Sequence, residues 1–217
     1  MIPSSALSLL ALHYPRPSIV LDHGERCCRS ALAWLHGIDT SHSYRHSHWY
    51  PPAWLRRTFG WGPMRWPISW CQVPEATQLD CGAFAAVAVR LIQMRGAPAI
   101  PVQLILRYPR DAAAQWRRMW EREGLSPAWI VDEFCYHEAC GLMAGERLLL
   151  WDPTENQWLD APSSTRDVYE SITAIRLGEL RDRSPTPVGW SGLSLHPGVW
   201  QILAIGEDGT MTSLPKG

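Results

Sequence analysis

Residues 80–98 of the chain read DCGAFAAVAVRLIQMRGAP. Within this stretch, between Gly82 and the glycine at 96, three residues are strongly polar: Arg90, Gln93 and Arg95. A helix here is therefore apolar almost all round, which is typical of a buried helix and not of a surface one. Gly96 is a common helix stop. The pattern predicts a central, buried helix over residues 82–95.

Cys81 opens this predicted helix. A thiol at a helix N-terminus lies at the positive end of the helix dipole, which favours the thiolate and predicts a lowered pKa. The first backbone amides of a helix have no intrahelical acceptor, so they can bind an oxyanion. The alternative is a structural cysteine, because Cys packs as a small hydrophobe.

Other elements extend on both sides of the central helix. Periodicity, caps and turn residues predict further helices over residues 25–35, 53–58 and 111–123. Strands are predicted at 100–107, 129–139, 147–151 and 171–177, with a hairpin over 200–214. Helices followed mainly by antiparallel strands indicate an α+β fold. We expect one domain over 1–217, in which an N-terminal helical and Trp/Pro-rich segment (1–76) and C-terminal strands (159–217) flank a catalytic core (77–158).

Composition limits the classes of partner and the compartment. The 217 residues carry a net charge of -1, which gives no electrostatic footprint for nucleic acid. No run of about 18 apolar residues is present, so no membrane span is predicted. The apolar stretch at 6–12 is short for a signal peptide. Six cysteines in such a chain are more typical of free thiols than of a disulfide framework, and we predict a cytoplasmic protein.

His137 and Asp152 form a second pattern, fifteen residues apart in two predicted strands. If residues 144 and 145 make a two-residue loop, His137 lies directly opposite Asp152 on one face, with Cβ atoms about 4.5–5.5 Å apart. A carboxylate there holds the imidazole's tautomer and leaves its other nitrogen for a thiol. A slip of one residue would separate the two side chains. The alternative is a surface histidine and an aspartate in an Asp-Pro turn.

The sequence at 80–85, DCGAFA, followed by the apolar helix and RGAPA at 95–99, resembles the nucleophile helix of the transglutaminase-like superfamily. WDPT at 151–154, after His137, is similar to the Asp-Pro-Thr strand of that family. The resemblance covers residues 77–158.

This resemblance implies a papain-like core with Cys81 as nucleophile, His137 as base and Asp152 as the residue that orients the base. Two departures bear on the substrate more than on the triad. Ala139 stands where the family often has Trp, and an insertion at 110–127 lengthens the path from the nucleophile to the histidine.

A metal site is the main competing interpretation of the histidine strand. Cys135, His137 and Cys140 form a Cys-x-His-x-x-Cys run. In a strand, the first two share a face and Cys140 points the other way, whereas structural zinc needs four converging ligands. We therefore predict no metal and no other cofactor.

A second oxyanion donor is harder to choose. Gln72 is the candidate, because a side-chain amide can act beside the Cys81 backbone N–H. Gln78 and Trp70 are its rivals.

Tryptophans cluster in two places. The Trp/Pro-rich segment 49–70 either lines a groove for an apolar or peptidic substrate or packs under an irregular loop. In the insertion, Trp116 and Trp120 share one helix face at i,i+4, where they either pack in the core or close over the site.

Together these features predict a cysteine enzyme that forms an acyl-thioester on Cys81 from a peptide or a small acyl or amide substrate. Resolution by water makes it a peptidase or amidase, which we favour because water needs no second binding site. Resolution by an amine makes it an acyltransferase, which a dry, Trp-lined site would favour. A non-catalytic binding member of the fold is the third interpretation.

Overall fold

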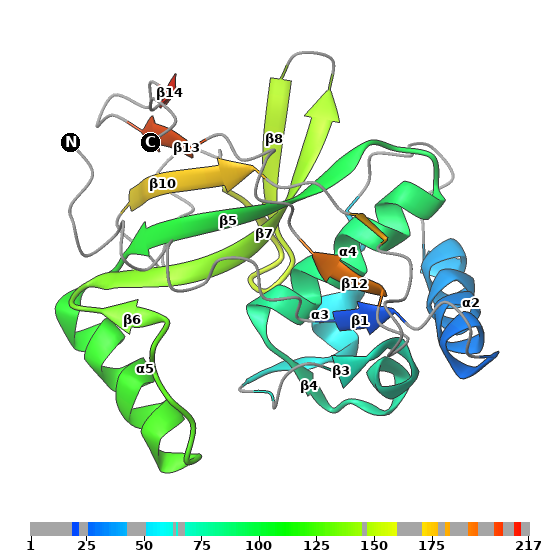
Figure 1. The fold of residues 1–217 in the computed structure, drawn as a ribbon, viewed down its shortest axis with the longest axis horizontal. Helices are drawn as coiled ribbons and strands as arrows, with labels where there is room; N and C mark the ends of the chain where they lie inside the picture. The colour runs from blue at the N-terminus through cyan, green and yellow to red at the C-terminus, as the bar shows by residue number, and fades with distance from the viewer. Residues whose placement is uncertain are drawn as a thin grey trace.

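The structure is a computed structural model. It describes residues 19–21, 26–42, 51–62, 64, 68–144, 147–159, 171–177, 181–182, 191–194, 202–205 and 211–213. Within these ranges the protein is α+β, with an antiparallel sheet and helices packed against it (Figure 1). The coarse fold class predicted from the sequence is therefore confirmed. The apolar stretch 6–12 lies outside the described residues, as do Trp49 and Trp66 of the Trp/Pro-rich segment.

The main sheet has the order β14-β13-β10-β5-β7-β8-β9 in its described part, and β6 pairs with β7 off this path. All its pairs are antiparallel. Its long central strands are β5 (Ala99–Arg107) and β7 (Phe134–Ala144). The others are β6 (Ile130–Val131), β8 (Arg147–Asp152), β9 (Gln157–Trp158), β10 (Ser171–Leu177), β13 (Ile202–Ile205) and β14 (Met211–Ser213).

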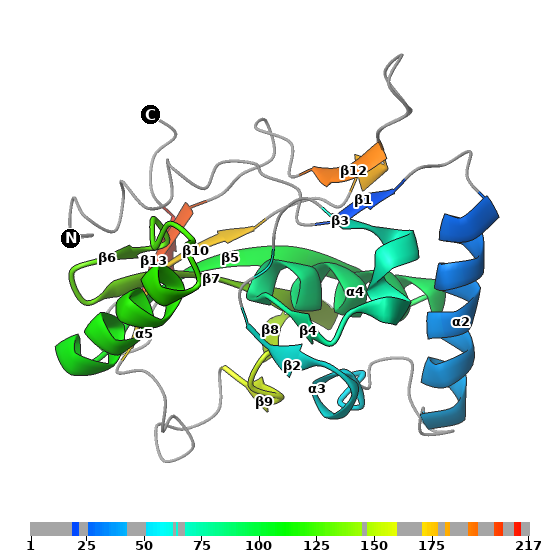
Figure 2. The ribbon, with the colours of Figure 1, turned by 90° about the horizontal axis from the view of Figure 1, so that it is seen from below.

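The central helix α4 (Cys81–Met94) packs against β5 and β7, as Figures 1 and 2 show. All but three of its residues after Cys81 are buried, as its apolar sequence predicts. Asp80 caps the helix by accepting a hydrogen bond from the backbone N–H of Ala83 at 2.8 Å. Gly96 follows with a φ of 83°, a left-handed conformation that ends the helix and favours glycine.

The helix α2 (Arg26–His42) flanks α4 and packs on the 3₁₀ helix η1 (Trp70–Glu75). It continues past Gly37, so the predicted end of this helix at residue 35 is wrong. Packing explains the extension, because Asp39 is fully buried and bonds both Trp54 Nε1 and the guanidinium of Arg95. Those contacts fix the last turns of α2 against the end of α4, which outweighs the weak helix propensity of one glycine.

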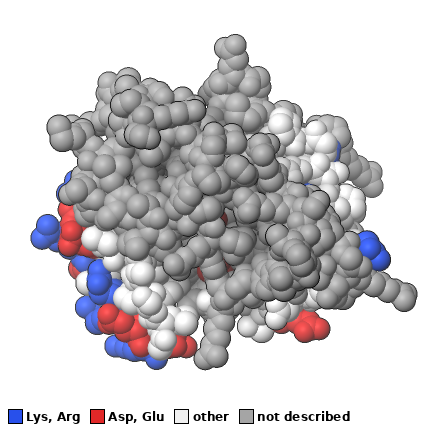
Figure 3. All heavy atoms as spheres, in the orientation of Figure 1, with Lys and Arg blue, Asp and Glu red and all other residues white. Residues whose placement is uncertain are grey.

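The helix α5 (Arg110–Arg122) lies beside β6 at the opposite end of the sheet from α2 (Figures 1 and 2). Acidic and basic side chains are interspersed over it (Figure 3). Trp116 and Trp120 lie on the other face of this helix. Arg117 links the helix to β6, because its Nη2 donates a hydrogen bond to the carbonyl of Ile130 at 2.9 Å. The predicted N-cap, Asp111, lies inside the first turn, because Pro109 is the capping residue.

Short elements complete the described part. The strands β1 (Ile19–Leu21), β3 (Ile68–Ser69), β11 (Arg181–Asp182) and β12 (Ser191–Ser194) make a small sheet in the order β11-β12-β1-β3. The strands β2 (Gly60–Trp61) and β4 (Gln78–Leu79) pair in parallel, next to the short helix α3 (Leu55–Thr58). The β2–β4 pair brings residues 60–61 of the Trp/Pro-rich segment to the start of α4.

The state of Cys71 differs from the sequence expectation. Cys81, Cys135 and Cys140 are free thiols, but Cys71 in η1 is disulfide-bonded. Its partner lies outside the described side chains. The prediction of free thiols is therefore wrong for Cys71, because a disulfide depends on which distant residues the fold brings together. This removes one argument for a cytoplasmic location, which stays a prediction. Among the described helices, none is long and apolar enough to cross a membrane.

Candidate active site

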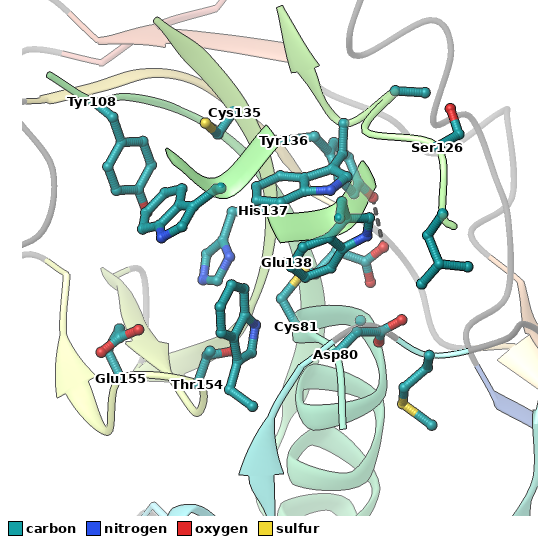
Figure 4. Close-up of a pocket in the computed structure, with 18 residues that line it drawn as sticks. Asp80, Cys81, Tyr108, Ser126, Cys135, Tyr136, His137, Glu138, Thr154 and Glu155 are labelled. Atoms are coloured by element: carbon teal, nitrogen blue, oxygen red, sulfur yellow. Dashed lines mark hydrogen bonds between the residues drawn. The ribbon is translucent and has the colours of Figure 1, made fainter. Parts of the chain in front are cut away.

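Cys81 lies at the first position of α4, where the helix meets β7 (Figure 4). Its side chain is half-buried and faces a pocket. The first helical hydrogen bond runs from the N–H of Phe84 to the carbonyl of Asp80, so the N–H groups of Cys81 and Gly82 precede it, and both residues line the same pocket. The helix start thus places a thiol and two backbone donors on one wall.

His137, in β7, contacts both Cys81 and Asp152. Its Nε2 lies 2.8 Å from Oδ2 of Asp152, and it shares a side-chain hydrogen bond with Cys81. Because Nε2 is taken by the carboxylate, Nδ1 is the ring atom left for the thiol. His137 is 9% exposed and Asp152 1% exposed, so solvent screens this pair weakly.

The predicted register between the two strands is wrong by two residues. Met143 pairs with Leu148, not with Glu146, and the last pair is Cys140 with Trp151. Continuing that register puts Asp152 opposite Ala139, which makes His137 its diagonal neighbour. A shift of two residues leaves every side chain on its own face, so the two groups still meet. A diagonal pair is within reach of a long or aromatic side chain.

Asp152 is itself held by the turn that follows β8. Its Oδ1 accepts from the backbone N–H of Thr154 at 2.8 Å and of Glu155 at 3.4 Å. One carboxylate oxygen is thus fixed by the backbone while the other bonds His137. This Asp-Pro-Thr turn explains why the aspartate serves both as a turn residue and as a partner of the histidine.

The pKa of His137 is raised well above its usual value. Burial disfavours the imidazolium, but the charge and hydrogen bond of Asp152 and the contact with Cys81 outweigh burial. The ring therefore holds its proton to higher pH than a free histidine.

The pKa of Cys81 is also raised, which contradicts the lowered value expected from the helix dipole. Burial is the largest cause, and the charges of Asp80 and Glu138 add to it. The hydrogen bond with His137 and its charge act in the opposite direction without reversing the shift. Desolvation and two nearby carboxylates thus outweigh the partial charge of the helix end.

The pocket in front of Cys81 has a volume of about 500 Å³. Five aromatic residues in mutual contact form much of its wall, and we call them the aromatic cluster: Trp61, Tyr108, Trp116, Trp120 and Trp129. The ring centroids of Trp120 and Trp129 lie 4.9 Å apart in an edge-on arrangement. Both tryptophans of α5 therefore line the pocket, whereas Trp54 and Trp70 of the Trp/Pro-rich segment are core residues.

Glu138 lies on the other side of Cys81 from His137 in Figure 4 and lines the same pocket. Its Oε1 accepts from the hydroxyl of Tyr136 at 2.6 Å. Strand alternation places Glu138 on the face of β7 opposite to that of His137, yet both residues line the pocket. The described pairs of β8 with β7 stop at Cys140, and beyond that point residues from both faces of β7, among them Tyr136 and His137, line the pocket.

Gln72, the predicted second oxyanion donor, is exposed and is not among the residues that line the pocket. A 3₁₀ helix has three residues per turn, so η1 buries Trp70 and Val73 and turns Gln72 outward. Gln78 and Trp70 do not line the pocket either. The assignment of Gln72 is therefore wrong.

The Cys-x-His-x-x-Cys run does not converge. Cys135 packs in a core cluster with strand β5 and α5, whereas Cys140 packs in another cluster with α4. Burial raises the pKa of Cys135 to about 12, with Arg117 opposing and Cys81 adding to the shift. Burial also raises the pKa of Cys140. The two cysteines thus lie in separate parts of the core.

Sequence reasoning missed several residues of the pocket: Asp80, Tyr136, Glu138, Thr154 and Glu155. Asp80 and Thr154 are direct neighbours of the predicted motifs, and that adjacency was a usable signal. The positions of Tyr136 and Glu138 depend on where β8 leaves β7, which no local pattern reveals.

Comparison of the chain with protein-family models, curated proteins and solved structures finds no match.

Proposed function

We propose that the protein is a cysteine-dependent enzyme that forms an acyl-thioester on Cys81. The contact series Cys81–His137–Asp152 carries this proposal, because thiol catalysis needs a nucleophile, a base and a group that orients the base. The resemblance to the transglutaminase-like superfamily supports the same assignment and implies a papain-like core.

In the proposed reaction, the neutral imidazole of His137 accepts the thiol proton as the sulfur attacks the carbonyl carbon of an amide. The tetrahedral oxyanion lies against the amides of Cys81 and Gly82 at the start of α4. When the carbon–nitrogen bond breaks, His137 returns the proton to the leaving amine and the acyl group stays on the sulfur. Asp152 stabilises the imidazolium throughout.

Hydrolysis of the thioester, as in a peptidase or amidase, is the first candidate. Acyl transfer to an amine is the second, and one observation favours it: the aromatic cluster gives the pocket beside Cys81 an apolar wall. Such a wall lowers the local water content and lengthens the life of a thioester. We propose a location in the cytoplasm, as expected from the sequence.

A burst experiment tests this function. The protein is mixed with p-nitrophenyl acetate, released nitrophenol is followed, and samples are quenched in acid for peptide mass mapping. We expect a burst of about one nitrophenol per protein chain, with the acetyl group on Cys81. The variant Cys81→Ala should show no burst, whereas Cys135→Ala, which removes another free thiol, should keep it. A burst that persists in Cys81→Ala would overturn the proposal.

Adding an amine separates the two outcomes of the thioester. Glycinamide at increasing concentration is included in the same assay, and acetate and N-acetylglycinamide are quantified. A constant yield of acetate supports the hydrolase. If N-acetylglycinamide replaces acetate as the main product at low glycinamide concentration, the result supports the acyltransferase.

A further inference from the structure

Three carboxylates border the pocket, and their placement around Cys81 is asymmetric. Asp80 and Glu138 lie near the thiol, and Glu155 is exposed where the turn after β8 borders the pocket (Figure 4). The described lining includes no lysine or arginine, so His137 is the cationic group in it. Arg56 acts on Glu155 from outside the lining. The described lining thus carries three carboxylates and one histidine.

The aromatic cluster faces the same space. Trp61 lies 5.3 Å from Trp120, and Tyr108 lies 4.4 Å from Trp116, both measured between ring centroids. The faces of tryptophan and tyrosine rings carry negative potential, which attracts ammonium and guanidinium groups. Aromatic faces together with carboxylates therefore favour a cation and disfavour an anion.

Polar atoms in the same wall add an independent sign of a ligand. The hydroxyl of Thr154 is buried, since the residue is 2% exposed, and it has no hydrogen-bond partner among the described residues. The indole Nε1 of Trp129 is likewise buried and without a described partner. Buried polar groups are normally paired, so these two are suited to bind a polar part of a substrate.

We propose that this pocket binds an acyl substrate with a fixed positive charge, an alkylammonium or guanidinium group such as the side chain of a lysine or arginine in a peptide. The proposal rests on the function proposed above and names its substrate class. The charged group would lie among the aromatic cluster and the carboxylates, with the carbonyl carbon at Cys81.

The cation belongs to the acyl donor and not to an attacking amine. An amine must lose its proton before it attacks a thioester. A wall of carboxylates and ring faces stabilises the protonated amine, which opposes that loss. A charge that is only recognised, and does not react, fits the wall better.

A bound cation would also act on the nucleophile. The charges of Asp80 and Glu138 help to raise the pKa of Cys81, after burial. A positive group between them and the sulfur would offset those charges and favour the thiolate. The substrate would thereby increase the reactivity of the residue that attacks it.

Charged thiol reagents test this directly on the wild-type protein. Cys81 is reacted with methyl methanethiosulfonate, its trimethylammonioethyl analogue and its sulfonatoethyl analogue. In each case the sulfur attacks the reagent, methanesulfinate leaves and a mixed disulfide forms. The rate constant of Cys81 with the cationic reagent is divided by its rate constant with the anionic reagent. This ratio is then divided by the same ratio measured for the free thiol 2-mercaptoethanol, which corrects for the intrinsic reactivity of the two reagents. We expect the corrected ratio for Cys81 to be roughly ten or more, in favour of the cationic reagent.

A corrected ratio of one or less, with Cys81 still labelled by the neutral reagent, would overturn the charge preference and leave the proposed function standing. No labelling of Cys81 by any reagent would overturn the proposed function and this inference with it. The variant Glu155→Gln should lower the corrected ratio. Glu123→Gln, an exposed carboxylate at the end of α5 outside the pocket, is the matched control and should leave the ratio at its wild-type value.

Substrate pairs then locate the charge. Peptide anilides with arginine or lysine on the acyl side are compared with their neutral isosteres, citrulline and norleucine. We expect kcat/KM to be roughly tenfold or more higher for the charged member of each pair. Equal values in both pairs would contradict the inference, and a preference confined to one pair would identify the guanidinium or the ammonium as the recognised group.

Discussion

Asp152 bonds His137 from a diagonal position across two antiparallel strands, at 2.8 Å, while its other oxygen is held by the backbone of its own turn. The carboxylate is thus oriented from two directions. A rigid partner of this kind fixes the tautomer of the imidazole and its angle to Cys81.

Replacing this carboxylate should separate orientation from folding. In Asp152→Asn, the amide cannot stabilise an imidazolium, and the pKa of His137 should fall from its raised value. We expect kcat/KM to fall by orders of magnitude, about 10⁴-fold where such a group sets the tautomer. Circular dichroism should stay unchanged. Full activity in the variant would show that another residue orients His137.

The pH dependence of Cys81 alkylation should reveal its electrostatic surroundings. The raised pKa predicts that iodoacetamide reacts slowly near neutral pH and faster as pH increases. In Glu138→Gln, one negative charge that opposes the thiolate is removed, so the profile should move to lower pH. Glu123→Gln serves as control. A shift to higher pH in Glu138→Gln would contradict the role given to this carboxylate.

Thr154 offers a test in which stability and function change in opposite directions. Its buried hydroxyl has no described partner, and an unsatisfied group of this kind costs about 1–3 kcal/mol. Thr154→Val keeps the shape and removes the hydroxyl, so the free energy of unfolding should increase by about 1 kcal/mol. If the hydroxyl binds substrate, KM should increase as well. Thr154→Ser should resemble wild type, and a less stable valine variant would contradict this account.

The sequence predicted what depends on local pattern. The buried helix α4, with its stop at Gly96, follows from apolar composition and one glycine. The common face of His137 and Asp152 follows from strand alternation. The register between β7 and β8 does not follow from alternation, because it depends on the turn that joins the strands. The predicted register is wrong by two residues, and a shift of two keeps His137 and Asp152 on the same face of the sheet.

Features that depend on tertiary contact were not predictable. The sign of the Cys81 pKa shift comes from burial and from Glu138, which outweigh the local helix dipole. The disulfide at Cys71 and the outward turn of Gln72 likewise depend on how η1 packs. Local reasoning thus placed Cys81 at the start of a buried helix but did not predict its environment.

The buried Asp39 should be essential for stability, not for catalysis. It bonds Trp54 Nε1 at 2.8 Å and pairs with Arg95, whose side chain is 9% exposed. Asp39→Ala leaves the guanidinium buried without its carboxylate, which should cost about 3–5 kcal/mol of unfolding free energy in urea denaturation. Asp39→Ala with Arg95→Met should recover part of the loss. A single variant as stable as wild type would contradict the importance of this pair.

The dependence of Cys81 acylation on His137 tests the central claim most directly. The rate constant for acetylation of Cys81 by p-nitrophenyl acetate is measured in wild type and in His137→Ala at one pH, with unfolding checked by circular dichroism. A general base typically contributes about 10²–10⁴-fold, so we predict a loss of that size in the variant. Equal rate constants in the two folded proteins would contradict the claim that His137 activates Cys81.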